Sequence, residues 1–230
     1  MPAVLAILAA GISSRAGVDK VLADLGGHPV LLWSVAAGQV AGCFREIIVV
    51  APPANLAAVL AVTQGRGSVR VIAGGATRTS SSWAALDAAG DAEIIAIHDG
   101  ARPFVPPSLF QRCVEIAQRD GSAIAGLPLA DTVRRANEAG AAREEIEREG
   151  LWAAQTPQVF GRGLLEKARL AAGDRSFSDD AAAVFAAGLS VKMVPGERRN
   201  LKITTLEDLG YARELVAKGL VGLPAWQVAR

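Results

Sequence analysis

The pattern that most constrains the fold is an alternation of short apolar segments with longer helical ones. Ala3–Ala9, Glu46–Ala51 and Glu93–His98 consist mainly of apolar residues, which is typical of strands buried on both faces. Strands of this kind, separated by helices, indicate a mainly parallel sheet that helices cover on both faces. We expect further strands at Val69–Ala73, Ala123–Leu127 and Val191–Val194, and helices at Val30–Ala41, Ala54–Thr63, Thr77–Ala89, Pro107–Gln118, Leu164–Ala172, Asp179–Ala187 and Leu206–Lys218.

Composition narrows the class of protein. The 230 residues are 51% hydrophobic and 20% charged, which suits one α/β domain and excludes a disordered chain. The net charge of +1 lacks the basic excess typical of general nucleic-acid binding. No uncharged apolar stretch is long enough to predict a membrane span. We therefore expect residues 1–230 to form a single Rossmann-like domain that binds neither nucleic acid nor membrane.

The cysteine content and the first residues of the chain indicate the cellular compartment. Cys43 and Cys113 are the only two cysteines, too few for a zinc site or a disulfide framework, which indicates a reducing compartment. Met1–Ile12 is apolar but lacks the basic start of a signal peptide, so we interpret it as the first buried strand. A cytoplasmic location is the resulting expectation.

One segment interrupts the alternation. Residues 130–152 contain a turn signal at Asn137–Gly140, followed by Ala141–Glu149 with four glutamates and two arginines in nine residues. Such a segment is too charged for the core. It is either a solvated surface hairpin or an arm that leaves the body of the domain and meets a partner.

The loop after the first strand contains groups that suit phosphate. It begins Leu-Ala-Ala-Gly at Leu8 and continues through Arg15 to Lys20. The spacing fits neither a dinucleotide fingerprint nor a Walker A loop. Small residues let backbone N–H groups approach a triphosphate, and the two cations supply positive charge. The alternative is an ordinary turn with two surface cations.

A second motif, His-Asp-Gly-Ala-Arg-Pro-Phe, runs from His98 to Phe104. Asp99 follows an apolar strand and so lies at the carboxyl edge of the sheet, where α/β proteins bind ligands. Its carboxylate could hold substrate hydroxyls, and Arg102 could hold a phosphate. The alternative is an Asp–Arg pair that orders the loop. His98 has no second histidine nearby, so we expect it to be structural.

These motifs resemble a known family. The first loop is similar to the nucleotide loop of sugar-phosphate nucleotidyltransferases, and the second motif resembles the H-D-x-A-R-P signature of the 2-C-methyl-D-erythritol 4-phosphate cytidylyltransferases. Leu151–Phe160 is similar to that family's L-W-x-x-x-T-P-Q-x-F. Asn200–Thr204, followed by Glu207–Leu209, resembles its N-x-K-x-T…E-D-L ending.

The resemblance implies an activity and an assembly. The protein would transfer the cytidylyl group of CTP to 2-C-methyl-D-erythritol 4-phosphate, with Mg²⁺ bound mainly through the CTP phosphates. It would be a homodimer with shared active sites, and residues 130–152 would form its dimerisation β-arm. The alternative activity is that of a ribitol-5-phosphate cytidylyltransferase. A molybdopterin nucleotidyltransferase would leave the His98–Phe104 and Leu151–Phe160 motifs unexplained. The set Arg15, Lys20, Asp99 and Lys202 argues against a non-catalytic nucleotide-binding module, because binding alone does not need charge at the α-phosphate.

The resemblance also implies a set of site residues, with no protein ligands to a metal. Departures from the family pattern occur at Ser13, Ser14, Asp19, Ala76 and Ser178, and the change at Ala76 puts a side-chain role in base recognition in doubt. The expected catalytic residues are Arg15, Lys20 and Lys202; the expected CTP-binding residues are Ala9, Ala10, Gly11, Ser13, Ser14, Gly75, Ala76, Ser81 and Gly100; the expected substrate-binding residues are Asp99, Arg102, Thr132, Arg148, Thr156 and Ser178.

Overall fold

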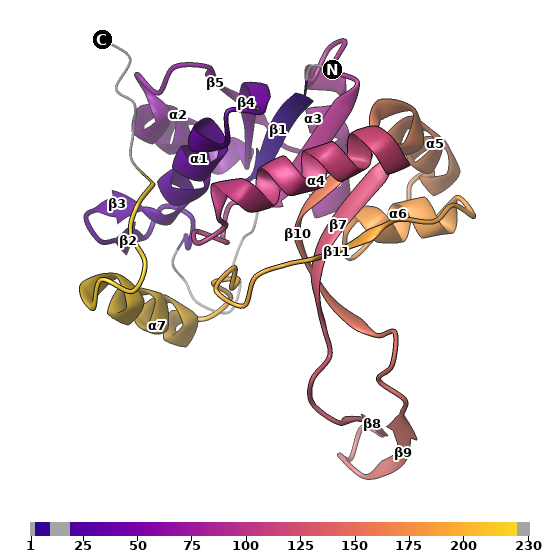
Figure 1. The fold of residues 1–230 in the computed structure, drawn as a ribbon. Helices are drawn as coiled ribbons and strands as arrows, with labels where there is room; N and C mark the ends of the chain where they lie inside the picture. Colours follow the sequence, from indigo (N-terminus) through magenta and orange to yellow (C-terminus); the bar gives the residue numbers. More distant parts are fainter. Residues whose placement is uncertain (1–2, 10–18, 225–230) are drawn as a thin grey trace.

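The computed structural model describes residues 3–9 and 19–224, which form a central sheet with helices on both faces (Figure 1). The strands of this sheet are β1 (Ala3–Leu8), β4 (Phe44–Ala51), β5 (Val69–Ala73), β6 (Ile94–Asp99), β7 (Ser122–Pro128), β10 (Trp152–Gly161) and β11 (Met193–Pro195). The helices are α1 (Val30–Ala41), α2 (Leu56–Thr63), α3 (Arg78–Ala88), α4 (Pro107–Asp120), α5 (Arg162–Ala172), α6 (Asp180–Ala186) and α7 (Leu206–Ala217), with a 3₁₀ turn at Pro53–Asn55. A small separate ribbon pairs β2 (Asp24–Leu25) with β3 (His28–Pro29).

The central sheet is mainly parallel, as the sequence predicts. Its strand order is β11-β7-β10-β6-β1-β4-β5. Strand β1 pairs in parallel with β4 and β6, β4 with β5, and β11 with β7, whereas β10 is antiparallel to both its neighbours. The apolar runs explain this arrangement, because a strand covered by helices on both sides has no solvent-facing side chains.

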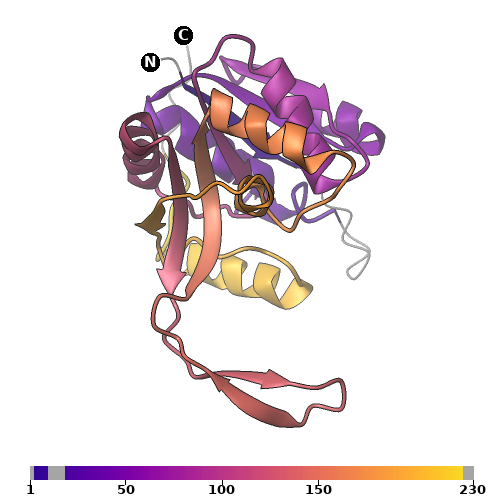
Figure 2. The ribbon, with the colours of Figure 1, turned by 90° about the vertical axis from the view of Figure 1, so that its right-hand side faces the viewer.

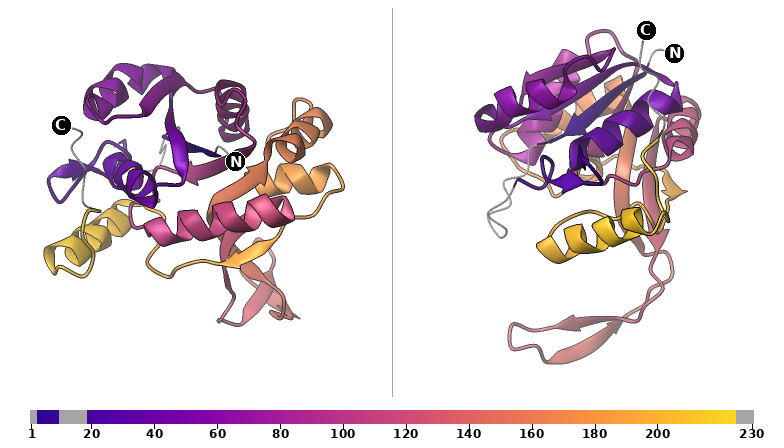
Figure 3. Two further views of the ribbon diagram at one scale, coloured as in Figure 1. Left: turned by 45° about the horizontal axis from the view of Figure 1, so that its top comes forward. Right: turned by 90° about the vertical axis from the view of Figure 1, so that its left-hand side faces the viewer.

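Alternate residues of β1 point into two separate cores. Leu5 and Ile7 pack with α1, α2 and α4 on one face, while Val4 and Ala6 pack with α3, α5 and α6 on the other. Figures 2 and 3 show these two helical layers on either side of the sheet. A third, smaller cluster joins α7 to the start of α1, with Trp33 and Phe104 in edge-to-face contact at 5.5 Å between ring centroids.

The topology defines one edge of the sheet as the place for a ligand. The chain passes from β1 to β4 and β5 on one side, and then crosses to β6 on the other side of β1. In α/β sheets, ligands bind at the carboxyl ends of the strands where the order reverses in this way. Gly100, directly after β6, donates its N–H to the Leu8 carbonyl at 2.9 Å. A Cβ at position 100 would lie 3.1 Å from that oxygen, so a glycine suits this close approach.

Strand β10 is an element that the sequence analysis does not predict. It fills the space between β6 and β7, and its register shifts between Ala154 and Gln158. Gln155, Thr156 and Gln158 are buried in it although they are polar. The expected alternation of strand and helix therefore fails after β7, where β10 runs antiparallel to its neighbours without a crossover helix.

Residues 130–152 form the predicted hairpin. Strands β8 (Val133–Ala136) and β9 (Ala142–Ile146) pair in an antiparallel ribbon, and Gly140 donates its N–H to the Asn137 carbonyl at 2.9 Å in the predicted turn. The ribbon projects away from the body as a continuation of β7 and β10 (Figures 1 and 2).

Among the described residues, no helix is both long enough and apolar enough to cross a membrane.

Candidate active site

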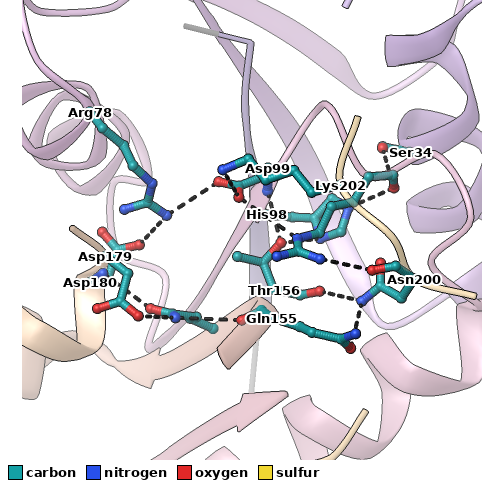
Figure 4. A network of polar contacts seen from close by, with 12 residues as sticks. Ser34, Arg78, His98, Asp99, Gln155, Thr156, Asp179, Asp180, Asn200 and Lys202 are labelled. Atoms are coloured by element: carbon teal, nitrogen blue, oxygen red, sulfur yellow. Dashed lines mark hydrogen bonds and ion pairs between the residues drawn. The ribbon is translucent and has the colours of Figure 1, made fainter. Parts of the chain in front are cut away.

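The centre of the candidate site is one carboxylate among three cations. Asp99 is the last residue of β6, and Lys202 Nζ lies 2.8 Å from its Oδ2 atom. Arg78 Nη2 lies 3.4 Å from the other oxygen, Oδ1, and Arg102 Nε lies 3.8 Å from Oδ2. These cations come from the start of α3, the loop after β6 and the segment before α7, and Figure 4 shows Arg78 and Lys202 beside Asp99.

The cations determine the protonation state of Asp99. Burial alone would raise the pKa of its carboxyl group, but Arg78, Lys202 and Arg102 outweigh burial and hold that pKa well below its usual range. Asp99 is therefore ionised at neutral pH. The three cations face two carboxylates, Asp99 and Asp180, so a net positive charge remains and this part of the site can accept an anion.

A chain of buried hydrogen bonds fixes the backbone at Asp99. The Asp99 N–H donates to Thr156 Oγ1 at 3.0 Å, and Thr156 Oγ1 lies 3.0 Å from His98 Nδ1. His98 Nε2 lies 3.2 Å from the Arg102 carbonyl, which can only accept, so Nε2 carries the proton and Nδ1 accepts from Thr156. Burial lowers the pKa of His98 to about 4. His98 is thus a neutral, buried structural residue, as the sequence indicates.

Asn200 places Lys202 beside Asp99. The Asn200 side chain is fully buried, and its amide donates to the Thr156 carbonyl at 2.7 Å. Arg102 Nη1 donates to the Asn200 carbonyl at 2.8 Å, and the Ile203 N–H donates to the Ala101 carbonyl at 2.8 Å. These bonds hold the segment that carries Lys202 against the loop after β6. The asparagine and the lysine of this motif therefore have different tasks, one internal and one directed at the site.

Two residues of the cluster, Arg78 and Asp180, are absent from the sequence-based set. Arg78 Nη2 lies 2.8 Å from Asp180 Oδ2, where only 2% of the Asp180 side chain is exposed. Burial alone would lower the pKa of Arg78, but Asp180 and Asp99 raise it above its usual value. The available signal was the position of Arg78 itself: it is the first residue of α3, the end of a helix where a cation is unfavourable.

The described residues among those expected to bind CTP lie around this edge of the sheet, and five of the expected site residues fall outside the described ones. Ala9 is buried and donates its N–H to the Val50 carbonyl at 2.9 Å. Ser81 is buried, with its hydroxyl bonded to the Thr77 carbonyl at 2.9 Å. Lys20 is half-buried and has no ion pair with any other described residue. Gly75 and Ala76 are exposed between β5 and α3, Gly100 is buried, and Ala10, Gly11, Ser13, Ser14 and Arg15 lie outside the described residues.

The residues expected to bind the acceptor lie in three places. Asp99, Arg102 and Thr156 converge in one cluster, although Arg102 and Thr156 are bonded to other parts of the chain. Thr132 and Arg148 are exposed in the arm, where Arg148 Nη1 donates to the Ala130 carbonyl. Within the described residues, no hydrogen bond or ion pair joins these two to Asp99. Ser178 is exposed, one residue before the N-cap of α6.

Comparison with known proteins identifies the family. Residues 3–218 match the family described as IspD: 2-C-methyl-D-erythritol 4-phosphate cytidylyltransferase. The chain belongs to the IspD family. The match covers the Asp99 cluster, the arm and all the strands of the sheet.

Individual IspD relatives agree with this assignment. The 2-C-methyl-D-erythritol 4-phosphate cytidylyltransferase of Nostoc punctiforme is 37% identical over 90% of this chain and 95% of its own length. The crystal structure of the protein of that name from Thermus thermophilus has a TM-score of 0.77, is 34% identical, and covers 94% of this chain and 100% of its own. The bifunctional enzyme IspD/IspF of Anaeromyxobacter sp. strain Fw109-5 is 44% identical over 93% of this chain. The chain spans 57% of that relative's length.

Proposed function

We propose that the protein transfers the cytidylyl group of CTP to 2-C-methyl-D-erythritol 4-phosphate, giving 4-(cytidine 5'-diphospho)-2-C-methyl-D-erythritol and pyrophosphate. The observation that carries this proposal is the convergence of three separate segments on Asp99. The loop after β6, the middle of β10 and the segment before α7 are far apart in the chain, yet hydrogen bonds and ion pairs join them at one strand end. The family match supports the choice of substrates.

The reaction needs positioning and positive charge rather than a base. A phosphate oxygen of the acceptor attacks the α-phosphorus of CTP in line, and the bond to the pyrophosphate oxygen breaks. The attacking phosphate is already ionised at neutral pH, so no proton has to be removed. Charge grows on the leaving pyrophosphate, and preorganised cations lower the barrier. His98 does not act as a base here, because both its ring nitrogens are engaged in buried hydrogen bonds.

The cluster assigns different tasks to its residues. Asp99, ionised and fixed through its backbone, accepts hydrogen bonds from hydroxyl groups of the acceptor. Lys202 has 42% of its side chain exposed, so its ammonium group can contact an anion without leaving Asp99. Lys20, with no ion pair to another described residue, is available to the α-phosphate of CTP. Arg15 serves as its counterpart in this proposal.

Mg²⁺ enters this proposal bound to the CTP phosphates. Among the described residues, no group of three histidines, cysteines or carboxylates is placed to hold a metal ion. Asp99, the carboxylate at the centre of the cluster, is already paired with cations. This donor set fits an ion that keeps most of its shell as phosphate oxygens and water. When bound, Mg²⁺ would neutralise triphosphate charge.

A homodimer with shared sites and a cytoplasmic location remain predictions.

The test is pyrophosphate release from CTP with each acceptor. We expect pyrophosphate with 2-C-methyl-D-erythritol 4-phosphate and, because the relatives are named for this acceptor, much slower turnover with ribitol 5-phosphate. The reverse preference would establish the ribitol-phosphate alternative. No pyrophosphate with either acceptor, together with retained CTP binding, would point to a non-catalytic nucleotide-binding module.

A further inference from the structure

Arg78 is shared unequally between two carboxylates. Its Nη2 atom lies 2.8 Å from Asp180 and 3.4 Å from Asp99, and about a fifth of its side chain is exposed. Figure 4 shows the guanidinium group between the two acids. Arg78 Nη2 donates a long hydrogen bond to Asp99 Oδ1 at 3.4 Å, whereas its shorter contact with Asp180 Oδ2 is an ion pair without hydrogen-bond geometry. The shorter ion pair with Asp180 thus keeps the arginine from closing further on the carboxylate at the centre of the site.

The position of Asp180 is itself fixed from β10. Gln158 Oε1 accepts the N–H groups of Asp180 and Ala181 at 3.1 and 3.0 Å, and Gln158 Nε2 donates to Asp179 at 2.8 Å. Asp179 in turn caps α6 by accepting the Ala182 N–H at 2.8 Å. The start of α6 is thus bonded to the strand that also carries Thr156. Asp180 has little freedom to follow Arg78 if the arginine moves.

The charges explain why a second acid is needed. Without Asp180, Arg78, Arg102 and Lys202 would all face Asp99 alone. Lys202 already occupies Oδ2 at 2.8 Å, so a released Arg78 would close on Oδ1. In a poorly solvated site, a guanidinium group on a carboxylate oxygen competes directly with a neutral hydroxyl for that oxygen. The acceptor would then lose its partner.

We propose that Asp180 is a positioning residue that keeps the hydrogen bond from Arg78 to Asp99 Oδ1 long, so that this oxygen can also accept a hydrogen bond from a hydroxyl group of the acceptor. The inference rests on the proposed function, because it assigns a partner to the acceptor of that reaction. It concerns acceptor binding and not the charge at the α-phosphate. Loss of this role should therefore raise the KM for the acceptor and leave the KM for CTP unchanged. A general loss of α6 packing would not affect one substrate alone.

The primary test is Asp180→Asn, which keeps the shape and removes the charge. We expect the KM for 2-C-methyl-D-erythritol 4-phosphate to rise roughly tenfold or more, as for loss of a hydrogen bond to a charged group. The KM for CTP should stay within about twofold, because CTP does not use Oδ1 in this scheme. Asp180→Glu keeps the charge and should restore most of the acceptor affinity. Val184→Ala creates a cavity under the buried face of α6, one turn beyond Asp180, without changing any charge. It is the control for helix packing and should leave both constants near wild type.

A second substitution tests whether the effect passes through Arg78. Adding Arg78→Gln to Asp180→Asn removes the intruding cation, so the acceptor KM should fall back toward the wild-type value. The double variant removes both members of the Arg78–Asp180 ion pair, so neither charge is left buried without its partner. It can therefore be measured even if Asp180→Asn alone does not fold. An acceptor KM unchanged in Asp180→Asn, or a double variant no better than the single one, would overturn the inference. If the wild-type protein forms no product from CTP and this acceptor, the proposed function fails and the inference falls with it.

Discussion

A chain of hydrogen bonds through Thr156 and His98 connects the backbone N–H of Asp99 to the carbonyl of Arg102. Thr156 accepts from the Asp99 N–H and donates to His98, which donates to the Arg102 carbonyl. Thr156 and His98 each use one donor and one acceptor, so neither can rotate without leaving a buried polar atom unpaired. The order of the site thus depends on a neutral imidazole.

That dependence predicts how stability changes with pH. The pKa of His98 is lowered to about 4 in the folded protein, whereas an unfolded histidine titrates near 6.5. Between these values the unfolded state binds more protons, so stability falls as pH falls from about 6.5 to about 4. The loss attributable to His98 is about 3 kcal/mol across this window. Urea unfolding at a series of pH values measures it.

His98→Gln supplies the comparison for that measurement. The amide can still donate near the Arg102 carbonyl and does not titrate, so the variant should show a flatter profile across the window between the two histidine pKa values. The carboxylates are common to both proteins and cancel in the difference. Parallel profiles for the two proteins would contradict the assignment of a buried neutral His98.

Lys20 carries the prediction about chemistry. If its ammonium group neutralises charge that develops at the α-phosphorus, Lys20→Ala should lower kcat by roughly 10²–10³-fold and change the KM for CTP much less. Lys20→Arg keeps the charge and should retain part of the rate. Steady-state kinetics with saturating acceptor decide the matter. Weaker CTP binding with an unaltered kcat would leave Lys20 a binding role only.

At the scale of elements, two helices begin with the same device and allow a matched comparison. Thr77 and Ser80 form a capping box at the start of α3, and Thr205 and Asp208 form one at the start of α7. Thr77→Ala and Thr205→Ala should each lower the free energy of unfolding by about 1 kcal/mol. Only α3 begins with Arg78, so only Thr77→Ala should also raise the KM for the acceptor. Equal kinetic effects from both variants would contradict this.

The buried strands β1 and β6, which the sequence predicted correctly, share one property. Runs such as Ile94–Ile97 are apolar throughout, and burial on both faces follows from the pattern without knowledge of the neighbours. Strand β10 has Gln155, Thr156, Pro157 and Gln158 in its middle, and proline within a run argues against a central strand. Its burial becomes understandable only from partners elsewhere in the chain, such as Asn200 and the start of α6.

The same distinction applies to the site. Asp99, Lys202 and Thr156 were predicted because they belong to motifs that resemble a family, and the structure brings them together. Arg78 and Asp180 were missed because their contact joins the starts of α3 and α6, which are far apart in the sequence. Local pattern carries no information on such a pairing. The unfavourable position of a cation at a helix start was the available hint.

At the scale of the whole molecule, the arm is the feature that suggests assembly. Its ribbon is held by cross-strand pairs, Arg134 with Glu145 at 3.1 Å and Arg135 with Glu144 at 2.8 Å, all largely exposed. Exposed pairs of this kind contribute little to stability. Because Arg148 lies in this projecting segment, the proposed shared site would receive it from the neighbouring subunit of a two-fold dimer.

Co-expression of two inactive variants tests the shared site. Lys20→Ala and Arg148→Ala should each be nearly inactive alone. In a mixed dimer with arms exchanged, one site collects both defects and the other collects neither, so random pairing should restore about a quarter of wild-type activity. If Arg148 serves its own chain, every site keeps one defect. Activity at the single-variant level, in a sample whose mixed dimers are verified by mass, would exclude the exchange.

The position of the antiparallel strand β10 between β6 and β7 has a consequence for folding during synthesis on the ribosome. Strands β1, β4, β5 and β6 can assemble from the first part of the chain, but β7 does not adjoin β6, because β10 occupies the place between them. Asp99 and Thr156 are 57 residues apart, so at about 5–20 residues per second the edge of β6 waits roughly three to eleven seconds for its partner. The hydrogen bonds that link Asp99, Thr156 and His98 form between β6 and β10. The candidate site is thus completed only when the two halves of the nascent sheet close on each other.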